Sequence, residues 1–257
     1  MSNQLQGKIA FVTGASSGIG EATALRFAAE GALVVLCGRR AEPLEQVKQT
    51  IINAGGKAEV AVADVSVEAE IVAAIEGVAQ RHGRLDILVN NAMAYTWGSV
   101  DSMSTEQWHA NFQTTVDGTF WGVRTAVRLM KDSGGGSIVN IASICGQFGT
   151  AWMTGYSAAK AAVINFSRAV ASEGAAYNIR CNVIIPGVVE TPAMAGMLSD
   201  PKARSNTEKL IPMKRVGRSE ELASAILFMA SDESSYVTGA TLNVDGGRSS
   251  DLYTVLE

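Results

Sequence analysis

The sequence predicts an α/β fold in which a doubly wound parallel sheet of about seven strands is flanked by helices on both faces. Short apolar runs rich in β-branched residues alternate with longer segments of helical periodicity. A parallel sheet needs such continuous apolar strands, because helices bury both of its faces. With 47% hydrophobic and 18% charged residues, the 257-residue chain can bury a large core. No linker-like stretch divides it, so we expect one domain over residues 1–257.

Strands and helices are expected to follow one another in turn. The strand candidates are residues 8–13, 33–37, 58–63, 85–90, 136–142, 180–185 and 241–244. The helix candidates are residues 18–30, 43–54, 67–82, 105–131, 155–177 and 219–230. Ser66, Ser104 and Ser219 precede acidic residues and are expected to cap three of the helices.

One long connection resists assignment. Residues 191–211 have weak periodicity, and Pro192, Pro201 and Pro212 punctuate the region. We therefore expect a mobile substrate loop over approximately residues 190–215.

Composition and charge exclude several functional classes. A net charge of −4 and a pI near 5.4 give no electrostatic footprint for nucleic acid or for an anionic membrane. No apolar run approaches the roughly 18 residues of a membrane span. Residues 1–7 also lack the basic and then apolar pattern of a signal peptide. We expect a cytoplasmic protein with a small-molecule partner.

Cysteines and histidines suggest neither a metal site nor a histidine mechanism. Cys37, Cys145 and Cys181 are widely spaced and contain no CxxC pair, which argues against a disulfide framework and a zinc site. We expect all three to be buried small side chains and predict no metal. His82 and His109 stand apart from any serine or cysteine nucleophile.

A glycine-rich turn joins the first strand to the first helix. It reads Thr13-Gly14-Ala15-Ser16-Ser17-Gly18-Ile19-Gly20. Glycines allow a tight turn there and let backbone N–H groups approach a pyrophosphate at the positive end of the helix. The strand before the turn and the helix after it favour a dinucleotide site over a turn without a ligand.

The end of the second strand favours NADP(H). An acidic side chain at this place would bond the ribose hydroxyls of NAD and repel a 2′-phosphate. The position is Gly38, and Arg39 and Arg40 follow it, with no carboxylate before Glu42. Guanidinium groups suit a phosphate. The alternative is that both arginines are solvated surface charges.

A tyrosine and a lysine form a candidate catalytic pair. Tyr156 and Lys160 are four residues apart in a predicted helix, so both side chains emerge on one face. A neighbouring ammonium stabilises a phenolate and lowers the pKa of the tyrosine toward a range useful for acid–base catalysis. Ser143 follows a strand, where its hydroxyl could hold the reacting oxygen.

Taken together, these motifs resemble the short-chain dehydrogenase/reductase family, a group of about 250 residues with a single Rossmann domain. The resemblance covers nearly the whole chain. Its elements stand in family order as Thr13 to Gly20, Asp64-Val65, Asn90-Asn91-Ala92, Ser143, Tyr156 with Lys160, Pro186-Gly187, and Val244-Asp245-Gly246-Gly247.

The resemblance implies a role for each motif. Tyr156 would exchange a proton with the reacting oxygen, Lys160 would bind the nicotinamide ribose, and Ser143 would orient the substrate. The cofactor contacts expected from motif and resemblance together are Gly14, Ser16, Ser17, Gly18, Ile19, Gly20, Arg39, Arg40, Asp64, Val65, Asn90, Ala92, Tyr156, Lys160, Pro186, Gly187, Val189 and Thr191. The helices predicted over residues 105–131 and 155–177 carry more apolar surface than one sheet face needs, which predicts self-association. The resemblance implies a homotetramer, with the segment that ends in residues 244–247 joining a second interface.

Two positions depart from the family pattern. Met93 stands where the family has the glycine of NNAG, which places a flexible thioether near the cofactor. Thr115 stands at the position of the family's fourth catalytic residue, an asparagine. Asn111 lies one helical turn earlier, about 6 Å along the axis, which is too far for a simple exchange. We expect Thr115 to keep a water-holding role.

Loop residues indicate the substrate. The side chains expected to face it are Met93, Tyr95, Trp97, Trp152, Met153, Met194 and Met197. They favour a bulky apolar or aromatic ketone or alcohol. Trp108 and Trp121 are expected to be packing residues. The alternatives are a 3-oxoacyl thioester reductase of fatty-acid type and a catalytically silent NADP(H)-binding regulator.

Overall fold

The computed structural model describes residues 3–250 of the chain, and within them seven strands form one parallel sheet in the order β3-β2-β1-β4-β5-β6-β9. The strands are β1 (Ile9–Thr13), β2 (Leu33–Gly38), β3 (Lys57–Val62), β4 (Ile87–Asn90), β5 (Gly136–Ile141), β6 (Ile179–Pro186) and β9 (Thr241–Val244). The predicted doubly wound sheet is confirmed. Its order reverses between β1 and β4, and at such a reversal the carboxyl ends of the strands leave room for a ligand.

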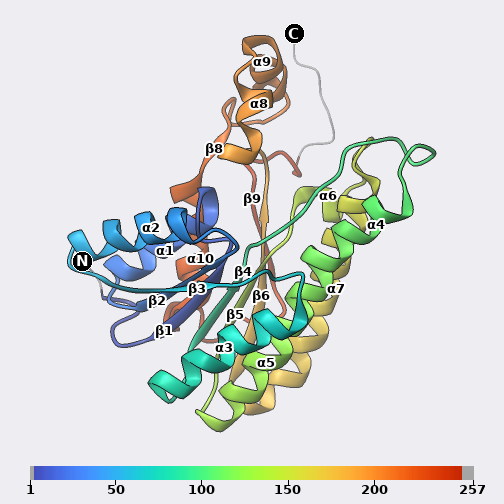
Figure 1. Ribbon diagram of the computed structural model, residues 1–257. Coiled ribbons are helices and arrows are strands. Elements are labelled where there is room, and N and C mark those ends of the chain that lie inside the picture. Colours follow the sequence, from blue (N-terminus) through green and yellow to red (C-terminus); the bar gives the residue numbers. More distant parts are fainter. Residues whose placement is uncertain (1–2, 251–257) are drawn as a thin grey trace.

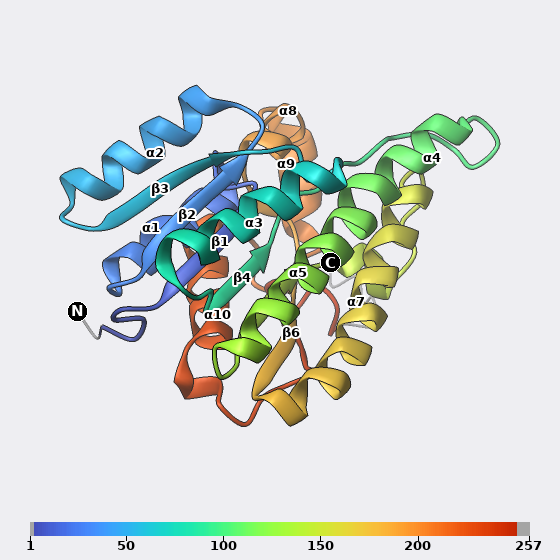
Figure 2. The same ribbon diagram turned by 60° about the horizontal axis from the view of Figure 1, so that its bottom comes forward.

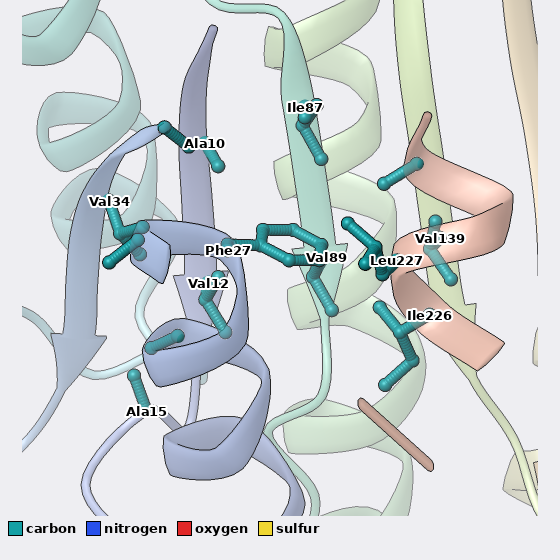
Figure 3. Packing of buried hydrophobic residues seen from close by; sticks show 14 of the residues in the cluster. Ala10, Val12, Ala15, Phe27, Val34, Ile87, Val89, Val139, Ile226 and Leu227 are labelled. Carbon is teal, nitrogen blue, oxygen red and sulfur yellow. The ribbon is translucent and has the colours of Figure 1, made fainter. Parts of the chain in front are cut away.

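Helices cover both faces of the sheet (Figure 1, Figure 2). One face carries α1 (Gly18–Ala29), α2 (Ala41–Asn53) and α10 (Ser219–Ala230), and the other carries α3 (Glu68–His82), α5 (Gly118–Asp132) and α7 (Thr154–Gly174). Each face buries its own hydrophobic core. In the first core, Phe27 of α1 points toward Val89 of β4 (Figure 3). Rigid packing of this kind fixes the strand ends that carry the candidate site.

The long helix predicted over residues 105–131 is interrupted. It consists of α4 (Thr105–Phe112), a π-helical turn (Gln113–Asp117) and α5. The wider π turn changes the direction in which the following side chains point around the helix axis. Such turns are frequent at functional sites. Thr115 lies inside this turn.

Of the three predicted caps, one is confirmed. The Ser104 hydroxyl accepts the N–H of Gln107 at 3.2 Å and completes a capping box at the start of α4. Ser66 is not a cap, because its hydroxyl donates to Asp64 at 2.7 Å and α3 begins two residues later. Ser219 is the first residue of α10 rather than its cap.

The region predicted as a loop over 190–215 contains regular structure, so that prediction was wrong in this respect. It holds a 3-10 turn (Pro192–Met194), α8 (Ala195–Leu198) and α9 (Pro201–Lys209), and the strands β7 (Val189–Glu190) and β8 (Gly217–Arg218) pair at its base. Leu198, Ile211 and Val216 form a small core of their own. Since so few residues are buried, the periodicity is weak. α8 and α9 project at the top of Figure 1.

A short helix, α6 (Ile144–Gln147), also follows β5 without having been predicted. None of the helices within residues 3–250 combines the length and the apolar composition needed to cross a membrane.

Candidate active site

The glycine-rich turn after β1 is folded so tightly that it requires glycine. A Cβ atom added to Gly20 would lie 2.2 Å from the carbonyl oxygen of Gly14. Gly14 and Gly18 have φ angles of +64° and +58°, in the left-handed region that favours glycine. Thr191 stands over the turn, with its Cγ2 3.2 Å from where a Gly18 Cβ would be. The turn and the start of the 190–215 region therefore face each other.

Two residues that the sequence reasoning missed brace this turn. The hydroxyl of Thr13 accepts the backbone N–H groups of Asn91 and Ala92 at 2.9 and 3.0 Å. The side-chain amide of Asn91 donates back to the Thr13 carbonyl at 3.0 Å. These bonds lock the ends of β1 and β4 together at the reversal of the sheet. Their positions in the Thr13–Gly20 and Asn90-Asn91-Ala92 motifs were the available signal.

Asn90 points into the sheet. Its side-chain N–H donates to Asn140 of β5 at 2.8 Å, and Asn140 donates in turn to the hydroxyl of Ser167 on α7 at 2.8 Å. All three side chains are buried. Buried amides whose hydrogen bonds are satisfied rigidify their surroundings. This chain of bonds therefore holds α7, which carries Tyr156 and Lys160, against the strands.

The predicted adenosine end of the site brings together Arg39 and Asp64. One guanidinium nitrogen of Arg39 lies 3.8 Å from a carboxylate oxygen of Asp64, and the arginine side chain is 76% exposed. The other carboxylate oxygen accepts the N–H and the hydroxyl of Ser66 at 2.9 and 2.7 Å. Arg40 is also exposed at the start of α2. Guanidinium groups are thus accessible directly after Gly38.

The closing Val244–Gly247 motif supports the end of β6. Gly187 lies so close to Asp245 that an added Cβ would come within 2.8 Å of the Cα of Asp245. The Asp245 carboxylate accepts the N–H groups of Gly247 and Ser249, both at 2.9 Å. The N–H of Gly187 donates to the carbonyl oxygen of Val244 at 3.2 Å, so this motif holds the end of β6 in place. Val189, also a predicted cofactor contact, is buried in β7.

Ser143, Tyr156 and Lys160 come together beyond the end of β5. The Ser143 hydroxyl accepts the N–H of Cys145 at 3.2 Å at the start of α6. The Nζ of Lys160 donates to the carbonyl oxygen of Ile141 at 2.7 Å and lies 5.7 Å from the ring centre of Tyr156. Lys160 is only 2% exposed.

Burial controls the pKa values of both α7 groups. It raises the pKa of Tyr156 to about 12, and an interaction with the Ser143 hydroxyl opposes that rise. It lowers the pKa of Lys160 to about 7. The expected lowering of the tyrosine pKa by the lysine is therefore not found in this structure: burial is the largest influence on the Tyr156 pKa, and the influence that lowers it comes from Ser143. Tyr156 is held as a protonated phenol.

The expected substrate side chains gather in part around Tyr156. The ring of Tyr95 packs edge-on against that of Tyr156, with 6.4 Å between centroids and 77° between planes. Met93, Trp97 and Trp152 are exposed. Further along the chain, Met153 and Met197 are partly exposed. Met194 instead packs against the small core of Leu198, Ile211 and Val216.

A family model described as enoyl-(acyl carrier protein) reductase matches residues 14–249. The chain belongs to the short-chain dehydrogenase/reductase family. It is 41% identical over 244 residues to a 3-oxoacyl-[acyl-carrier-protein] reductase of Thermotoga maritima. The aligned residues cover 95% of this chain and 98% of that protein. It is 40% identical over 241 residues to cis-4-hydroxycyclohexanecarboxylate dehydrogenase of Sinomonas cyclohexanicum, covering 93% and 96%.

Solved structures agree with this membership. A putative 2-deoxy-D-gluconate 3-dehydrogenase from Agrobacterium tumefaciens, with bound NADP, superposes with a TM-score of 0.90 at 33% identity. The match covers 97% of this chain and 99% of that one. Short-chain dehydrogenase/reductases use a nicotinamide cofactor. Membership of the family therefore makes this chain a nicotinamide-dependent oxidoreductase.

At the family's asparagine position this short-chain dehydrogenase/reductase has a buried, unsatisfied hydroxyl. Thr115 is 1% exposed, and within residues 3–250 its hydroxyl has no hydrogen-bond partner. Its carbonyl accepts the hydroxyl of Thr119 at 2.7 Å. Asn111 is fully buried and bonded to Thr96 and Gln107, so its amide does not replace the family's asparagine.

The remaining candidate residues lie away from this chemistry. His82 bonds to Glu59 at 2.8 Å, on the outer face of β3. Cys37 and Cys181 are buried free thiols, as predicted, and burial raises the pKa of each to about 12. Cys145 is also a free thiol but is partly exposed beside Ser143. Within the described residues no group of three His, Cys, Asp or Glu side chains could hold a metal ion.

Proposed function

We propose that this chain is an NADP(H)-dependent oxidoreductase that transfers a hydride between the nicotinamide and a ketone or secondary alcohol. The observation that carries the proposal is the meeting of Ser143, Tyr156 and Lys160 in one largely buried site at the carboxyl ends of the strands. Sheets of this class bind their ligands at that edge. We propose that residues 1–257 form one domain built around this site.

The residues present fit a pyrophosphate-containing nucleotide. The turn leaves no room for a side chain at Gly14 or Gly20, and the first turn of α1 offers backbone N–H groups. The Ser17 side chain makes no capping bond to the helix, which leaves its hydroxyl for a phosphate. Asp64, Val65 and Ala92 would line the adenine and ribose portions. When bound, the nicotinamide nucleotide gives or accepts the hydride.

Arg39 supports the choice of NADP(H). Its exposed guanidinium follows Gly38, where no carboxylate opposes a 2′-phosphate. Asp64 lies close enough to orient it. The similar protein from Agrobacterium tumefaciens with bound NADP is consistent with this assignment.

Each catalytic side chain has a separate task. The raised pKa of Tyr156 keeps its phenol protonated, so it can donate a proton to a carbonyl oxygen during reduction. During oxidation the phenol would first have to release this proton, and its phenolate oxygen would then receive the proton of the alcohol. The Ser143 hydroxyl accepts from Cys145, which leaves its own hydrogen to bond the reacting oxygen. Lys160 uses one N–H on Ile141, and its remaining hydrogens can hold the nicotinamide ribose.

We propose a substrate that is bulky and apolar or aromatic. The ring of Tyr95 packs against that of Tyr156. Met93 and Trp97 are exposed two residues to either side of Tyr95 in the chain, and Trp152 is exposed four residues before Tyr156, so a ring would find apolar partners. The relative from Sinomonas cyclohexanicum is named for a ring alcohol. The second candidate is a 3-oxoacyl thioester, which the name of the Thermotoga maritima relative favours.

We also propose that the chain forms a homotetramer. Phe120 of α5 is exposed and packs edge-on against Phe166 of α7, and Trp108 stacks on Phe112 along α4. Aromatic side chains exposed along neighbouring helices are typical of subunit contacts. Gel filtration giving a monomer near 26.9 kDa would refute self-association. The free thiols fit a reducing compartment such as the cytoplasm.

A panel assay tests the function. NADPH and NADH oxidation is followed with aromatic ketones, small ketones and acetoacetyl thioesters, with Tyr156→Phe as the blank. We expect NADPH-dependent turnover of aromatic ketones that Tyr156→Phe abolishes. Turnover of thioesters alone would replace the proposed substrate with the second candidate. Tight NADPH binding without turnover of any substrate would instead support a silent regulator.

A mutant pair tests the cofactor assignment. Arg39→Ala should raise the Kd of NADPH about tenfold and leave that of NADH nearly unchanged, because an exposed charge-assisted phosphate contact is worth about 1.5 kcal/mol. Lys48→Ala removes the same charge from the following helix and should change neither value. An equal loss for both nucleotides in Arg39→Ala would contradict phosphate recognition.

A further inference from the structure

We propose that Asn111 is a positioning residue that fixes one wall of the substrate site against Tyr156 and so determines which substrate shapes are accepted. The wall is the 93–100 loop, which follows β4 and carries Tyr95 and Trp97. The proposal rests on the proposed function in one respect, because it takes Tyr156 to be the proton donor.

The amide of Asn111 uses all of its main hydrogen-bonding groups. Its side-chain nitrogen donates to the hydroxyl of Thr96 at 2.7 Å and to the carbonyl oxygen of Gln107 at 2.8 Å. Its side-chain oxygen accepts the backbone N–H of Thr96 at 3.2 Å. The residue is 0% exposed. Water therefore cannot compete for these bonds, and Thr96 is held through both its backbone and its side chain.

Thr96 lies between the two aromatic residues of the wall. Fixing Thr96 fixes the backbone of Tyr95, whose ring meets that of Tyr156 edge-on at 6.4 Å. It also limits where the exposed Trp97 can lie. The position of the loop relative to the proton donor thus depends on bonds made by a residue of α4.

A second anchor holds the other end of the wall. The N–H of Gly98 donates to the carbonyl oxygen of Trp152 at 2.9 Å, and Gly98 pairs with Met153 as an isolated bridge. Trp152 has a φ of +68°, a left-handed conformation that a bulky residue rarely adopts. Tertiary contacts must maintain it. The 93–100 loop is therefore tied to α4 at Thr96 and to the segment before α7 at Gly98.

The same amide also packs against the helix that carries the proton donor. Gly155 precedes Tyr156, and a Cβ added to Gly155 would lie 2.9 Å from the side-chain nitrogen of Asn111. Asn111 thus touches the backbone of the first turn of α7 while it bonds the wall. One buried side chain sets the spacing between Tyr95 and Tyr156 from both sides.

This arrangement predicts a selective effect on large substrates. A ring that contacts Tyr95 and Trp97 needs the wall in place, whereas a small ketone contacts the catalytic side chains alone. Loss of the Asn111 bonds should therefore raise KM for ring substrates and change kcat less. A residue that only stabilised the fold would affect both substrates equally.

Two variants and a matched control test the proposal. Asn111→Ala removes the whole side-chain amide. Thr96→Val removes only the hydroxyl that accepts from this amide and keeps the shape of the threonine, so it disturbs folding less than Asn111→Ala does. Asn182→Ala is the control, since Asn182 is also 0% exposed and bonds Val237 and Ala240 at 2.8 and 3.0 Å, on the far strand β6. For each, kcat and KM are measured with an aromatic ketone and a small ketone.

We expect Asn111→Ala to lower kcat/KM for the aromatic ketone about three- to tenfold relative to the small ketone, as the loss of a few buried hydrogen bonds would. Thr96→Val should lower it about twofold. Asn182→Ala should lower thermal stability and leave the ratio unchanged. An unchanged ratio in both Asn111→Ala and Thr96→Val would overturn the proposal. Turnover that survives in Tyr156→Phe would instead overturn the proposed function.

Hydrogen exchange supplies a readout that needs no activity. In the wild-type protein the backbone amide of Thr96 should exchange slowly, because it donates to a buried acceptor. Asn111→Ala should accelerate that exchange at least tenfold, while Asn182→Ala should not. Fast exchange of Thr96 in the wild type, or equal rates in the two variants, would refute the positioning role even if no substrate were turned over.

Discussion

Lys160 should make the stability of the cofactor-free protein rise with pH. Burial lowers its pKa from 10.5 to about 7, and its Nζ donates to the Ile141 carbonyl at 2.7 Å. In the unfolded chain the lysine keeps its ordinary pKa. Between pH 7 and 10.5 the unfolded chain therefore binds a proton that the folded chain lacks. The free energy of unfolding increases with pH wherever the unfolded state holds more protons.

The size of this effect follows from the shift of the Lys160 pKa. One pKa unit corresponds to about 1.4 kcal/mol, so the full window down to a pKa of about 7 carries on the order of 5 kcal/mol. Between pH 7 and pH 9 the expected gain is on the order of 2 kcal/mol. Cys37 and Cys181, whose pKa values burial raises to about 12, act in the opposite direction above pH 9.

A variant isolates the lysine from these other groups. Lys160→Met keeps the length of the side chain and removes its titration. Urea unfolding of both proteins at pH 7 and pH 9 should show a gain of about 2 kcal/mol in the wild type that the variant lacks. The thiols and carboxylates contribute equally to the two proteins and cancel in the difference. Identical pH dependence in both would show that the folded lysine keeps its ordinary pKa.

Three further predictions concern the cofactor turn and the proton path. Gly38→Asp should move the Kd preference about ten- to a hundredfold toward NADH. The fold should tolerate the change, because the new Cβ meets only Leu44 at 3.6 Å. Retained NADPH preference in fluorescence titration would contradict this prediction. Thr115→Val should lower kcat severalfold with little change in the free energy of unfolding, since the buried hydroxyl has no partner within residues 3–250. Unchanged turnover would show that this hydroxyl plays no part in the reaction. A severalfold gain of kcat in Thr115→Asn would show that the wild-type proton relay is impaired. Gly20→Ala should abolish measurable NADPH binding, because its Cβ would lie 2.2 Å from the Gly14 carbonyl, and a normal Kd by calorimetry would disprove that constraint.

The sheet could be predicted because its central strands bury both faces, as β1 and β4 do at every residue. The predicted strand 33–37 differs from β2 by one residue, and 241–244 matches β9. The interruption of the long helix at Gln113–Asp117 could not be predicted from apolar periodicity, since a π turn adds one residue without changing composition. The adjacent β-branched residues Thr114, Thr115 and Val116 were the available signal.

The closeness of Tyr156 and Lys160 could also be predicted, because the two residues belong to a short motif with fixed spacing. Tyr156 and Lys160 are one helical turn apart, and the geometry of a helix puts them on one face. Their pKa values could not be predicted from that spacing. Spacing reports the neighbouring charge but not the burial, and burial is the larger effect for both groups.

The hydrogen-bond partners of the buried asparagines could not be predicted for a different physical reason. Asn91 bonds to Thr13, 78 residues away, and Asn90 bonds to Asn140, 50 residues away. The sequence does not distinguish a buried asparagine from an exposed one, and only the folded structure shows which groups it bonds. The motifs therefore indicate the family, whereas hydrogen bonds of buried amides hold the strand ends and α7 in place. If Asn111 sets the spacing of Tyr95 and Tyr156, family members that share the catalytic trio but differ at position 111 should accept substrates of different shape.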